Sequence, residues 1–342
     1  MDKILFFHPR NDFTGSTRVL ANVIESEYWG QSVSVITINN QEGFLSLLPN
    51  VKIIPIYFPF SKIGKIPIVT PLVWRIHALL LALFYGWRYD TFYINTITPC
   101  YAAIVGRLFR KRLIYHVHEK FVAKSISVRM YEYVFNHVKS KRIFVSEYVK
   151  KQYPEKEGCE SVVKYNTLPN TFLSKVISTP IEFRNRNRVI MISSLTKAKG
   201  IFTYVEVARN LPEYYFRLLI SADMVRIKAF LDCSLPANVE LIPAQSDIHP
   251  FLRDSDLMMN LSIPALCIET FGMTILEAMA YGIPAIVPNV GGPVELVENG
   301  YNGYCVDVTD PLIVTDAVRM ALNENEYPRL ANNALQRFHM FT

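Results

Sequence analysis

Short apolar runs alternate along the chain with longer segments in which apolar residues recur every three or four positions. Runs of the first kind are typical of buried strands, and segments of the second kind are typical of amphipathic helices. In the first half, the pattern predicts a helix from about Thr17 and strands at Lys3–His8, Val33–Ile38, Thr91–Ile94, Leu113–His116 and Arg142–Val145. In the second half, it predicts strands at Val189–Ile192, Phe216–Ile220, Val239–Ile242, Leu257–Asn260, Ile283–Val287 and Tyr304–Val306. This alternation predicts an α/β protein with parallel sheets.

Polar, loop-forming sequence separates the two series of strands and indicates two domains. A chain of 342 residues is also longer than most single domains. We expect a Rossmann-like domain over residues 1–170, a linker over residues 171–188 that contains TPIEFRNRNR, and a second Rossmann-like domain over residues 189–328. Residues 329–342 are expected to be the start of a last helix, so we expect the chain to end before that helix is complete.

Composition is consistent with packed domains and narrows the class of protein. Half of the residues are hydrophobic and 19% are charged, which is enough apolar sequence for buried cores. The N-terminus, MDKILFFHPR, lacks the basic region and apolar stretch of a signal peptide, so we expect a cytoplasmic protein. The five cysteines are scattered without metal-ligand spacing and are expected to be reduced thiols: Cys100, Cys159, Cys233, Cys267 and Cys305.

Positive charge is concentrated in the first half of the chain. Residues 1–170 carry 22 lysines and arginines against 12 aspartates and glutamates, a balance of +10. Residues 171–342 carry 14 against 18, a balance of −4, which leaves the net charge of +6. A basic half is suited to an anionic partner. Nucleic acid is not expected as that partner, because no recognised nucleic-acid-binding motif accompanies the charge.

Two segments place basic charge beside apolar sequence. Residues 106–112 (GRLFRKR) interleave cations with apolar side chains, and residues 57–67 mix aromatics, prolines and lysines ahead of the apolar run Leu72–Trp87. That run is shorter than the ~20 apolar residues that cross a bilayer. Two interpretations stay open: a membrane-surface patch near a lipid-linked acceptor, or an amphipathic helix packed on the first sheet beside a solvated loop.

The segment from Glu269 to Gly303 (ETFGMTILEAMAYGIPAIVPNVGGPVELVENGYNG) carries the most chemistry. Two carboxylates, Glu269 and Glu277, are separated by seven residues across a predicted loop-to-helix junction, and the helix should end at Gly282. Pro293 is placed to begin another helix after a glycine turn. A helix N-terminus reached through glycine can bind an anion, and carboxylates can hold vicinal sugar hydroxyls. A nucleotide sugar combines these two kinds of group.

This segment resembles the E-x7-E signature of the retaining glycosyltransferases of family 4, which have the GT-B fold and include bacterial polysaccharide-biosynthesis enzymes. The matching positions beyond Glu269 are Gly272, Glu277, Ala278, Met279, Ala280, Gly282, Pro284, Gly291, Gly292, Glu295 and Gly303. The resemblance implies two Rossmann-like domains that face each other across a cleft. The alternative is an ordinary helix–strand–helix unit whose glutamates are solvated helix charges.

The same resemblance implies roles for the donor-binding residues. Glu269 is expected to contact donor-sugar hydroxyls, and Glu277 is expected to hold the nucleotide ribose. The intervening backbone is expected to approach the sugar and the diphosphate; it is formed by Phe271, Gly272, Met273 and Thr274.

A loop after the first predicted strand resembles the family's first glycine-containing loop, which faces the donor diphosphate. Gly15 is present in it, while Ser16 replaces the usual second glycine, so close backbone approach is less assured. Arg18 follows in the predicted helix. Its side chain either reaches phosphate or acceptor, or remains on the helix surface.

A second loop, SSLTKAKG, follows the first strand of the second half. Lys199 before Gly200 matches the family's lysine, which grips the diphosphate. Ser194 stands where the family usually has an arginine, a planar and permanently charged donor that lysine does not equal. Lys197 is a candidate for partial replacement.

Two histidines lie in the sequence YHVHE. We expect His116 and His118, which alternate with apolar residues at a strand end, to point to opposite faces, and this argues against a shared zinc site. His118 is the better match to a histidine of the family that touches the donor sugar. Each could instead be a hydrogen-bonded core histidine.

The sequence Asp254-Ser255-Asp256 has the form of the D-x-D metal motif of another glycosyltransferase fold. It precedes a predicted strand and matches a helix-to-strand step of the GT-B family, so we expect no bound metal. Charge on the leaving diphosphate would then be stabilised by Lys199 and by the helix N-terminus near Gly272. Ser146, Glu147 and Asn166 also resemble positions near the cleft of that family.

Together these features predict a cytoplasmic glycosyltransferase at the inner face of the membrane. It is expected to move a hexose-type sugar from a nucleoside diphosphate, with UDP favoured over GDP, to a saccharide or lipid-linked saccharide in cell-surface polysaccharide synthesis. The resemblance implies retention of configuration, no cofactor besides the nucleotide-sugar substrate, and catalytic roles for Glu269, His118 and Lys199.

Two alternatives belong to other classes of protein. The first is a non-catalytic GT-B-like partner subunit that binds nucleotide sugar or membrane, and Ser194 and Ser16 favour it. The second is a sugar-nucleotide epimerase or a sugar phosphorylase with the GT-B fold. Turnover without an acceptor, or dependence on inorganic phosphate, would identify the second.

Overall fold

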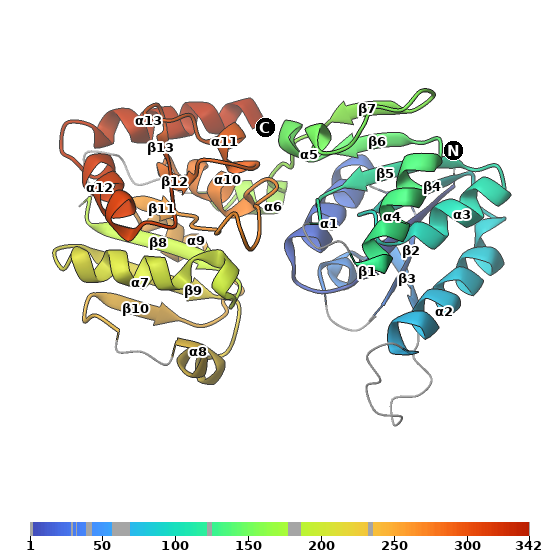
Figure 1. Ribbon diagram of the computed structural model, residues 1–342, viewed down its shortest axis with the longest axis horizontal. Coiled ribbons are helices and arrows are strands. Elements are labelled where there is room, and N and C mark those ends of the chain that lie inside the picture. The colour runs from blue at the N-terminus through green and yellow to red at the C-terminus, as the bar shows by residue number, and fades with distance from the viewer. Residues whose placement is uncertain are drawn as a thin grey trace. The chain divides into compact units, whose positions relative to one another are not determined.

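The computed structural model describes residues 3–28, 30, 31, 33–38, 43–56, 69–121, 125–176, 186–231 and 235–341, without the side chains of residues 69–73. The segment 57–67, residues 177–185 of the predicted linker, and Cys233 lie outside the described residues. The chain divides into unit 1, Met1–Tyr165, and unit 2, Asn166–Thr342, each with its own sheet (Figure 1).

Unit 1 is built on a parallel sheet whose described strands lie in the order β3-β2-β1-β4-β5-β6-β7. The strands are β1 (Ile4–Arg10), β2 (Val33–Ile38), β3 (Val51–Ile56), β4 (Thr91–Asn95), β5 (Arg112–Val117), β6 (Lys141–Phe144) and β7 (Glu160–Val163). Leu5 of β1 pairs with Ser34 of β2 and with Phe92 of β4. This is the doubly wound order, in which ligands bind beyond the carboxyl ends of the strands where the order reverses, here between β1 and β4.

Helices connect these strands and cover the sheet. They are α1 (Gly15–Glu27), α2 (Val69–Gly86), α3 (Cys100–Leu108), α4 (Ile126–His137) and α5 (Glu147–Lys151), with a 3₁₀ turn at Phe44–Leu47. α3 packs against both α2 and α4, so these three form one layer (Figure 1). α4 begins after Ser125, whose hydroxyl oxygen accepts a hydrogen bond from the backbone N–H of Val128 and so caps the helix.

Unit 2 repeats the plan, with described strands in the order β10-β9-β8-β11-β12-β13. The strands are β8 (Arg188–Ser193), β9 (Tyr215–Ile220), β10 (Val239–Ile242), β11 (Leu257–Met259), β12 (Ala285–Pro288) and β13 (Gly303–Val306). The helices are α6 (Asn170–Leu173), α7 (Ile201–Asn210), α8 (Met224–Leu231), α9 (His249–Arg253), α10 (Met273–Met279), α11 (Pro293–Leu296), α12 (Pro311–Ala321) and α13 (Tyr327–Phe338), with 3₁₀ turns at Lys197–Lys199 and His339–Phe341. The order reverses between β8 and β11.

The last helix packs on unit 2. Tyr327 and Leu330 of α13 are fully buried in the same core as Leu218 of β9. Asn333 donates from Nδ2 to the carbonyl of Tyr301 at 2.8 Å, and Arg337 donates from Nη2 to the carbonyl of Glu295 at 2.8 Å. α13 also contacts α10, so the end of the chain supports the helix that carries Glu277.

The predicted strands are all present, with ends that differ from the prediction by at most two residues. The sequence pattern missed β3 and β7, which are the two edge strands of unit 1. β3 contains Pro55, which cannot donate to a ladder and is tolerated at a sheet edge, and β7 is only four residues long. The first helix begins at Gly15, two residues before the predicted start.

The described helices include none with both the length and the hydropathy that spanning a bilayer requires. α2 is the helical form of the predicted apolar run.

Candidate functional site

Lys199 and Glu269 form an ion pair where the strand order of unit 2 reverses. Lys199 lies in the turn after β8, and Glu269 lies in the loop between β11 and α10. Lys199 Nζ is 2.6 Å from Glu269 Oε2 and 3.4 Å from Ser262 Oγ. The two charged side chains are 23% and 21% exposed, so a ligand can reach both. Burial disfavours the charged amine, but the carboxylate of Glu269 outweighs this effect and raises the pKa of Lys199 above its ordinary value.

A tight turn places Lys199 against the end of β11. Gly200 follows it with a left-handed φ of 73°, and a Cβ at this position would lie 2.1 Å from the carbonyl oxygen of Leu261. Glycine therefore meets both the conformation and the close approach. The carbonyl of Ala198 also accepts a 2.8 Å hydrogen bond from the N–H of Ile263. The two loops on which the ion pair stands are thus held to each other by backbone contacts.

The pair Gly291–Gly292 supports the loop that carries Glu269. The N–H of Gly292 donates to the carbonyl of Glu269 at 2.9 Å, and a Cβ on Gly292 would lie 2.1 Å from the carbonyl oxygen of Thr270. Pro293 then occupies the first turn of α11, as predicted. The sequence indicated only a turn here, whereas the structure shows that these glycines allow one loop to pack closely on another.

The other candidates of the E-x7-E segment follow Glu269 directly. Phe271 is buried, Gly272 caps α10, and Met273 and Thr274 form the first, half-buried turn of that helix. Glu277 lies within α10 and is 1% exposed. It is therefore a buried carboxylate, and the alternative of a solvated helix charge does not describe it.

Ser194 lies on the surface in the loop after β8. Lys197, the candidate for partial replacement of the family's arginine, is exposed, and its Nζ lies 6.0 Å from the ring centroid of Phe202. Lys199 is therefore the cation of this loop that contacts Glu269.

The D-x-D sequence has a structural role. Asp256 accepts hydrogen bonds from the backbone N–H groups of Asn187 and Arg188 at 3.0 Å each. Asp254 pairs with the side chains of Arg188 and Arg217. The motif thus joins α9 to β11, as predicted for a helix-to-strand step. In the described part of the chain, no three histidines, cysteines, aspartates or glutamates gather in a way that could hold a metal ion.

In unit 1, a chain of polar contacts crosses the point where the strand order reverses. Asn95, the last residue of β4, lies with its Nδ2 2.9 Å from Nδ1 of His8 and 3.2 Å from the carbonyl oxygen of Ser16. Its Oδ1 lies 2.8 Å from Nε2 of His118. His8 in turn has Nε2 2.9 Å from the hydroxyl of Thr17. Asn95, His8, His118 and Thr17 are all buried.

The hydrogen bonds determine which nitrogens carry protons. The Ser16 carbonyl can only accept, so the Asn95 amide turns its N–H groups toward Ser16 and His8 and its oxygen toward His118. His118 and His8 therefore both carry a proton on Nε2. The Thr17 hydroxyl accepts from His8 and donates to Asp12 Oδ1 at 2.8 Å.

Burial keeps both histidines neutral. It lowers the pKa of His8 to about 4 and holds the pKa of His118 well below its ordinary value. Among the described residues, Nδ1 of His118 has no hydrogen-bond partner, so it offers a lone pair to a ligand.

The prediction that His116 and His118 point to opposite faces is wrong. Their ring centroids are 4.3 Å apart. Side chains alternate along a strand with a period of two, so residues two positions apart share a face. The argument against a shared zinc site that rested on opposite faces therefore fails, but His116 bonds Tyr93 through Nδ1 at 2.9 Å while His118 bonds Asn95. His116 is a core histidine whose pKa burial lowers to about 3.

The first loop places Gly15 and Ser16 at the start of α1. Gly15 is exposed, and no atom lies within 4 Å of a Cβ built on it, so its backbone is open to a ligand. Ser16 is half-buried because its carbonyl bonds Asn95. The guanidinium of Arg18 lies 5.9 Å from the ring centroid of Phe44.

Three further resembling positions also lie in loops after strands. Ser146 follows β6 and caps α5 by accepting from the N–H of Val149, and Glu147 begins that helix. Asn166 follows β7 and is buried.

Sequence reasoning missed three polar residues at these two sites. Asn95 ends a buried strand, and Ser262 follows the strand β11. Glu119 accepts a 3.2 Å bond from the N–H of Ile97, and burial raises its pKa to about 7. A usable signal was present, because a polar residue directly after a buried strand of a doubly wound sheet faces the ligand edge.

Residues 177–337 match the protein family described as "Glycosyl transferases group 1". N-acetyl-alpha-D-glucosaminyl L-malate synthase from Bacillus anthracis is 32% identical over 146 residues, which are 41% of this chain and 37% of that protein. Sucrose-phosphate synthase 4 from Arabidopsis thaliana is 31% identical over 99 residues, 29% of this chain and 9% of that protein. The chain therefore spans well under half the length of these curated relatives.

Solved structures agree with the fold over nearly the whole chain. The crystal structure of Anabaena Alr3699/HepE in complex with UDP and glucose superposes with a TM-score of 0.80 at 20% identity, over 99% of this chain and 95% of that one. Sucrose-phosphate synthase from Thermosynechococcus elongatus superposes with a TM-score of 0.76 at 16% identity, over 100% of this chain and 95% of that one. The two parallel sheets and these neighbours show the GT-B fold.

Proposed function

We propose that this chain moves a sugar from a nucleoside diphosphate to a saccharide or lipid-linked saccharide with retention of configuration. Its second unit matches the group 1 glycosyltransferases, and the chain has the GT-B fold. A UDP-sugar is the favoured donor and a GDP-sugar the next. Structures of the same fold that were solved with UDP and with UDP-glucose support this preference. The product would serve cell-surface polysaccharide synthesis.

The observation that carries this proposal is the Lys199–Glu269 pair. A cation and a carboxylate 2.6 Å apart, both partly exposed, match the junction at which a sugar joins a diphosphate. The diphosphate requires positive charge, and the sugar hydroxyls require acceptors. The pair lies beyond the carboxyl ends of β8 and β11, where a doubly wound sheet binds its ligand.

In the proposed reaction, an acceptor hydroxyl oxygen bonds the anomeric carbon on the face from which the leaving group departs. The bond between that carbon and the phosphate oxygen breaks, and its electron pair leaves with the nucleoside diphosphate. The hydroxyl proton passes to the leaving phosphate oxygen. Lys199 stabilises the negative charge that develops on the diphosphate, and Glu269 positions the sugar.

Other residues complete the proposed donor site. Neutral His118 offers its Nδ1 lone pair to a sugar hydroxyl, Glu277 holds the ribose, and the backbone of residues 271–274 approaches the sugar and diphosphate. Gly15 and Ser16 are proposed to present backbone to the diphosphate, and Ser194 is proposed to belong to a diphosphate-binding loop. Besides the donor and the acceptor, this scheme requires no cofactor.

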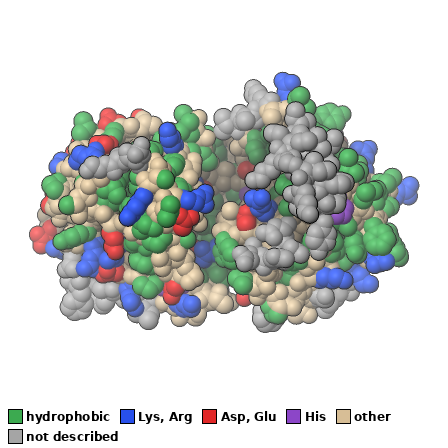
Figure 2. All heavy atoms as spheres, turned by 90° about the horizontal axis from the view of Figure 1, so that it is seen from below, with side chains coloured by type: hydrophobic (Ala, Val, Ile, Leu, Met, Phe, Trp, Pro, Cys, Tyr) green, Lys and Arg blue, Asp and Glu red, His purple; other side chains and the backbone are tan. Residues whose placement is uncertain are grey.

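We also propose that unit 1 contacts the inner face of a membrane that holds a lipid-linked acceptor. An apolar stripe on its surface consists of Ile76, Leu80 and Phe84 on α2, Trp87 directly after it, and Ile104 and Leu108 on α3, each 50–67% exposed. A basic rim continues from the ends of these helices: Arg88, Arg107, Arg110, Lys111 and Arg112. On the part of the surface that belongs to unit 1, Figure 2 shows green hydrophobic and blue cationic side chains side by side. This composition matches an anionic bilayer surface.

The proposal is tested by thermal unfolding in the presence of UDP-, GDP-, ADP- and dTDP-sugars. A donor at about 100 times its dissociation constant should add roughly 2.7 kcal/mol of stability. Lys199→Ala and Glu277→Ala should lose the stabilisation, while Lys228→Ala, at an exposed lysine of α8, should keep it. The absence of a shift with every nucleotide sugar would contradict the proposed donor site.

A non-catalytic partner subunit is the second candidate, and the exposed Ser194 in place of an arginine favours it. A partner subunit that binds nucleotide sugar would give the same donor binding as a transferase, so turnover separates the two functions. Release of nucleoside diphosphate that requires a saccharide or lipid-linked acceptor supports the transferase. Donor binding without release, across a panel of such acceptors, supports the partner subunit.

A further inference from the structure

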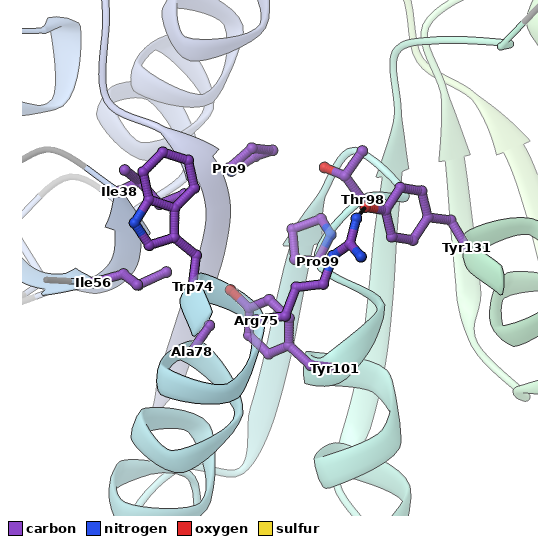
Figure 3. Close-up of a pocket in the computed structure, with 10 residues that line it drawn as sticks. All are labelled: Pro9, Ile38, Ile56, Trp74, Arg75, Ala78, Thr98, Pro99, Tyr101 and Tyr131. Atoms are coloured by element: carbon purple, nitrogen blue, oxygen red, sulfur yellow. Dashed lines mark hydrogen bonds between the residues drawn. The ribbon is translucent and has the colours of Figure 1, made fainter. Parts of the chain in front are cut away.

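A cavity of about 190 Å³ lies in unit 1 (Figure 3). Strands β1, β2 and β3 supply Pro9, Ile38 and Ile56 to it. Helices and one loop supply the rest of the lining: Trp74, Arg75, Ala78, Thr98, Pro99, Tyr101 and Tyr131. The cavity therefore stands at the carboxyl edge of the sheet, which is the ligand-binding edge of this fold.

Most of the cavity wall is apolar or aromatic. Trp74 and Ala78 are four positions apart on α2 and so share the helix face that borders the cavity. An engineered apolar cavity of about 150 Å³ holds one benzene molecule. A cavity of about 190 Å³ therefore accommodates one six-membered ring with a substituent. The flat faces of Trp74 and Tyr101 suit the apolar face of a sugar ring.

One end of the cavity is polar and cationic. In Figure 3 the guanidinium of Arg75 points toward Thr98 and Tyr131, on the side away from Trp74 and Ile38. Its Nη2 donates to the Tyr131 hydroxyl at 2.5 Å and to the Ser127 hydroxyl at 3.0 Å. Both bonds use the same nitrogen, so among the described residues Nε and Nη1 keep their donors for a ligand.

No described carboxylate of unit 1 balances the charge of Arg75. Its bonded partners are two neutral hydroxyls, and no described carboxylate forms an ion pair with it. The side chain is also half-buried, so water screens it incompletely. An oriented, half-buried arginine with free donors recognises a carboxylate or phosphate through charge-assisted hydrogen bonds.

We infer that this cavity binds a sugar ring that bears one anionic group, a phosphate or a carboxylate. The ring packs against the apolar wall, and the anion accepts from the Nη1 group of Arg75. The assignment of the bound sugar to the acceptor rests on the proposed function. The binding of an anionic sugar in this cavity does not depend on that function.

The inference is tested on the full chain by saturation-transfer NMR and calorimetry with glucose 1-phosphate, glucuronic acid and glucose. Glucose 1-phosphate or glucuronic acid should bind at least tenfold more tightly than glucose, and the comparison of the two identifies the anion. Arg75→Gln should weaken the anionic sugar at least tenfold. Arg129→Gln removes an exposed cation from α4, close to Tyr131, and should leave binding unchanged. Tyr131→Phe, which removes one acceptor that orients Arg75, should weaken binding severalfold.

Three results would overturn the inference. The first is that neither anionic sugar binds at millimolar concentration, and the second is that Arg75→Gln binds these sugars as tightly as the unchanged chain does. The third is that decyl phosphate, which has an alkyl chain in place of the sugar ring, binds more tightly than glucose 1-phosphate. Arg75→Lys covers the case in which Arg75→Gln does not fold, because it keeps the charge and should bind with intermediate affinity. UDP binding through Lys199 is measured on the same samples. Arg75-dependent sugar binding without nucleotide binding would leave this inference standing while the proposed function fails.

Discussion

At the residue scale, Asn95 performs two opposite tasks with one amide. Its N–H groups serve His8 and the Ser16 carbonyl, and its oxygen serves His118. The amide thereby sets the tautomers of both histidines. His118 is consequently presented as a neutral ring whose Nδ1 bonds none of the described residues, and this presentation depends on a residue 23 positions away in the sequence.

Asn95→Asp is expected to destabilise the protein by about 1–3 kcal/mol at pH 8, because an acceptor replaces the donors to His8 and Ser16. Part of the loss should return near pH 5.5, where His8 can take up a proton and pair with the new carboxylate. Urea unfolding at the two pH values measures both effects. Asn325→Asp makes the same chemical change at an exposed position and should cost little. Equal stability of Asn95→Asp and the unchanged chain at pH 8 would contradict the assigned amide orientation.

The buried histidines make stability depend on pH. The pKa of His8 falls to about 4 and that of His116 to about 3, while an unfolded histidine titrates near 6.5. The unfolded chain therefore binds more protons below pH 6.5, and the stability present above that pH is lost as the pH falls. Glu119, with its pKa raised to about 7, acts in the opposite direction between about 4.5 and 7, because the folded state then holds the extra proton.

With three histidines against one glutamate, the net effect has the sign of the histidines. Around pH 5.5, these four groups together should lower the unfolding free energy by roughly 2 kcal/mol for each unit by which the pH is lowered. Urea unfolding between pH 5 and 7 gives the slope. His116→Asn should reduce the slope by the amount that corresponds to about one bound proton. His137→Asn, at an exposed histidine of α4, is the matched control and should leave the slope unchanged. A stability that rises toward pH 5 would show that these histidines are not buried as neutral groups.

At the scale of elements, the loops after strands carry the chemistry and other loops hold them in place. The turn that contains Lys199 is bonded to the loop after β11, and Gly292 packs on the backbone next to Glu269. The glycine pair contributes no side chain, so it acts through close fit and through the backbone hydrogen bond from Gly292 to Glu269. The E-x7-E segment thus continues into the element that supports it.

Gly292→Ala is expected to shift the loop of Glu269, because the added carbon would lie 2.1 Å from the Thr270 oxygen. The stability loss should be about 1–3 kcal/mol, as for other overpacked sites. Donor binding, measured by calorimetry with the nucleotide sugar that stabilises the unchanged chain, should weaken at least tenfold. Gly15→Ala, where the added carbon meets no atom within 4 Å, is the comparison for stability. Normal donor affinity in Gly292→Ala would show that this packing does not position Glu269.

At the scale of the whole molecule, charge and apolar surface are distributed unequally. The first 170 residues carry a balance of +10, and the remaining residues carry −4. The apolar stripe and the basic rim both belong to the first part, on α2 and α3 and just after them. α2 therefore has two uses in these proposals, since one face borders the cavity and another is exposed.

The protein is expected to bind vesicles that contain anionic lipid more strongly than neutral vesicles, and high salt should weaken the binding. Each basic residue near such a surface contributes about 1 kcal/mol, so the double change Arg107→Gln and Arg110→Gln should reduce binding at least tenfold. Phe84→Ser with Trp87→Ser should also reduce it, by removal of inserted apolar area. Vesicle sedimentation measures all of these. Leu312→Ser and Arg226→Gln, at exposed positions of unit 2, are matched controls, and equal binding by every variant would refute the assigned surface.

Local sequence patterns were sufficient for the α/β class and for the predicted strands. This is because side-chain periodicity and turn residues act over a few positions. They failed for β3 and β7, since short or proline-containing edge strands have a weak pattern. The faces of His116 and His118 were also predicted wrongly. The sequence pattern there is clear, but the two-residue period of side chains along a strand was applied incorrectly.

The contacts that build the two sites join residues far apart along the chain. Lys199 and Glu269 are 70 positions apart, and His8 and Asn95 are 87 apart. Motif reasoning identified Lys199, Glu269 and His118 separately, but it did not show that Lys199 pairs with Glu269 or that Asn95 holds His118. The strand order decides which loops become neighbours, and it follows from packing of the whole sheet. The cavity around Arg75 likewise exists only where strands, helices and a loop meet, so tertiary structure alone reveals it.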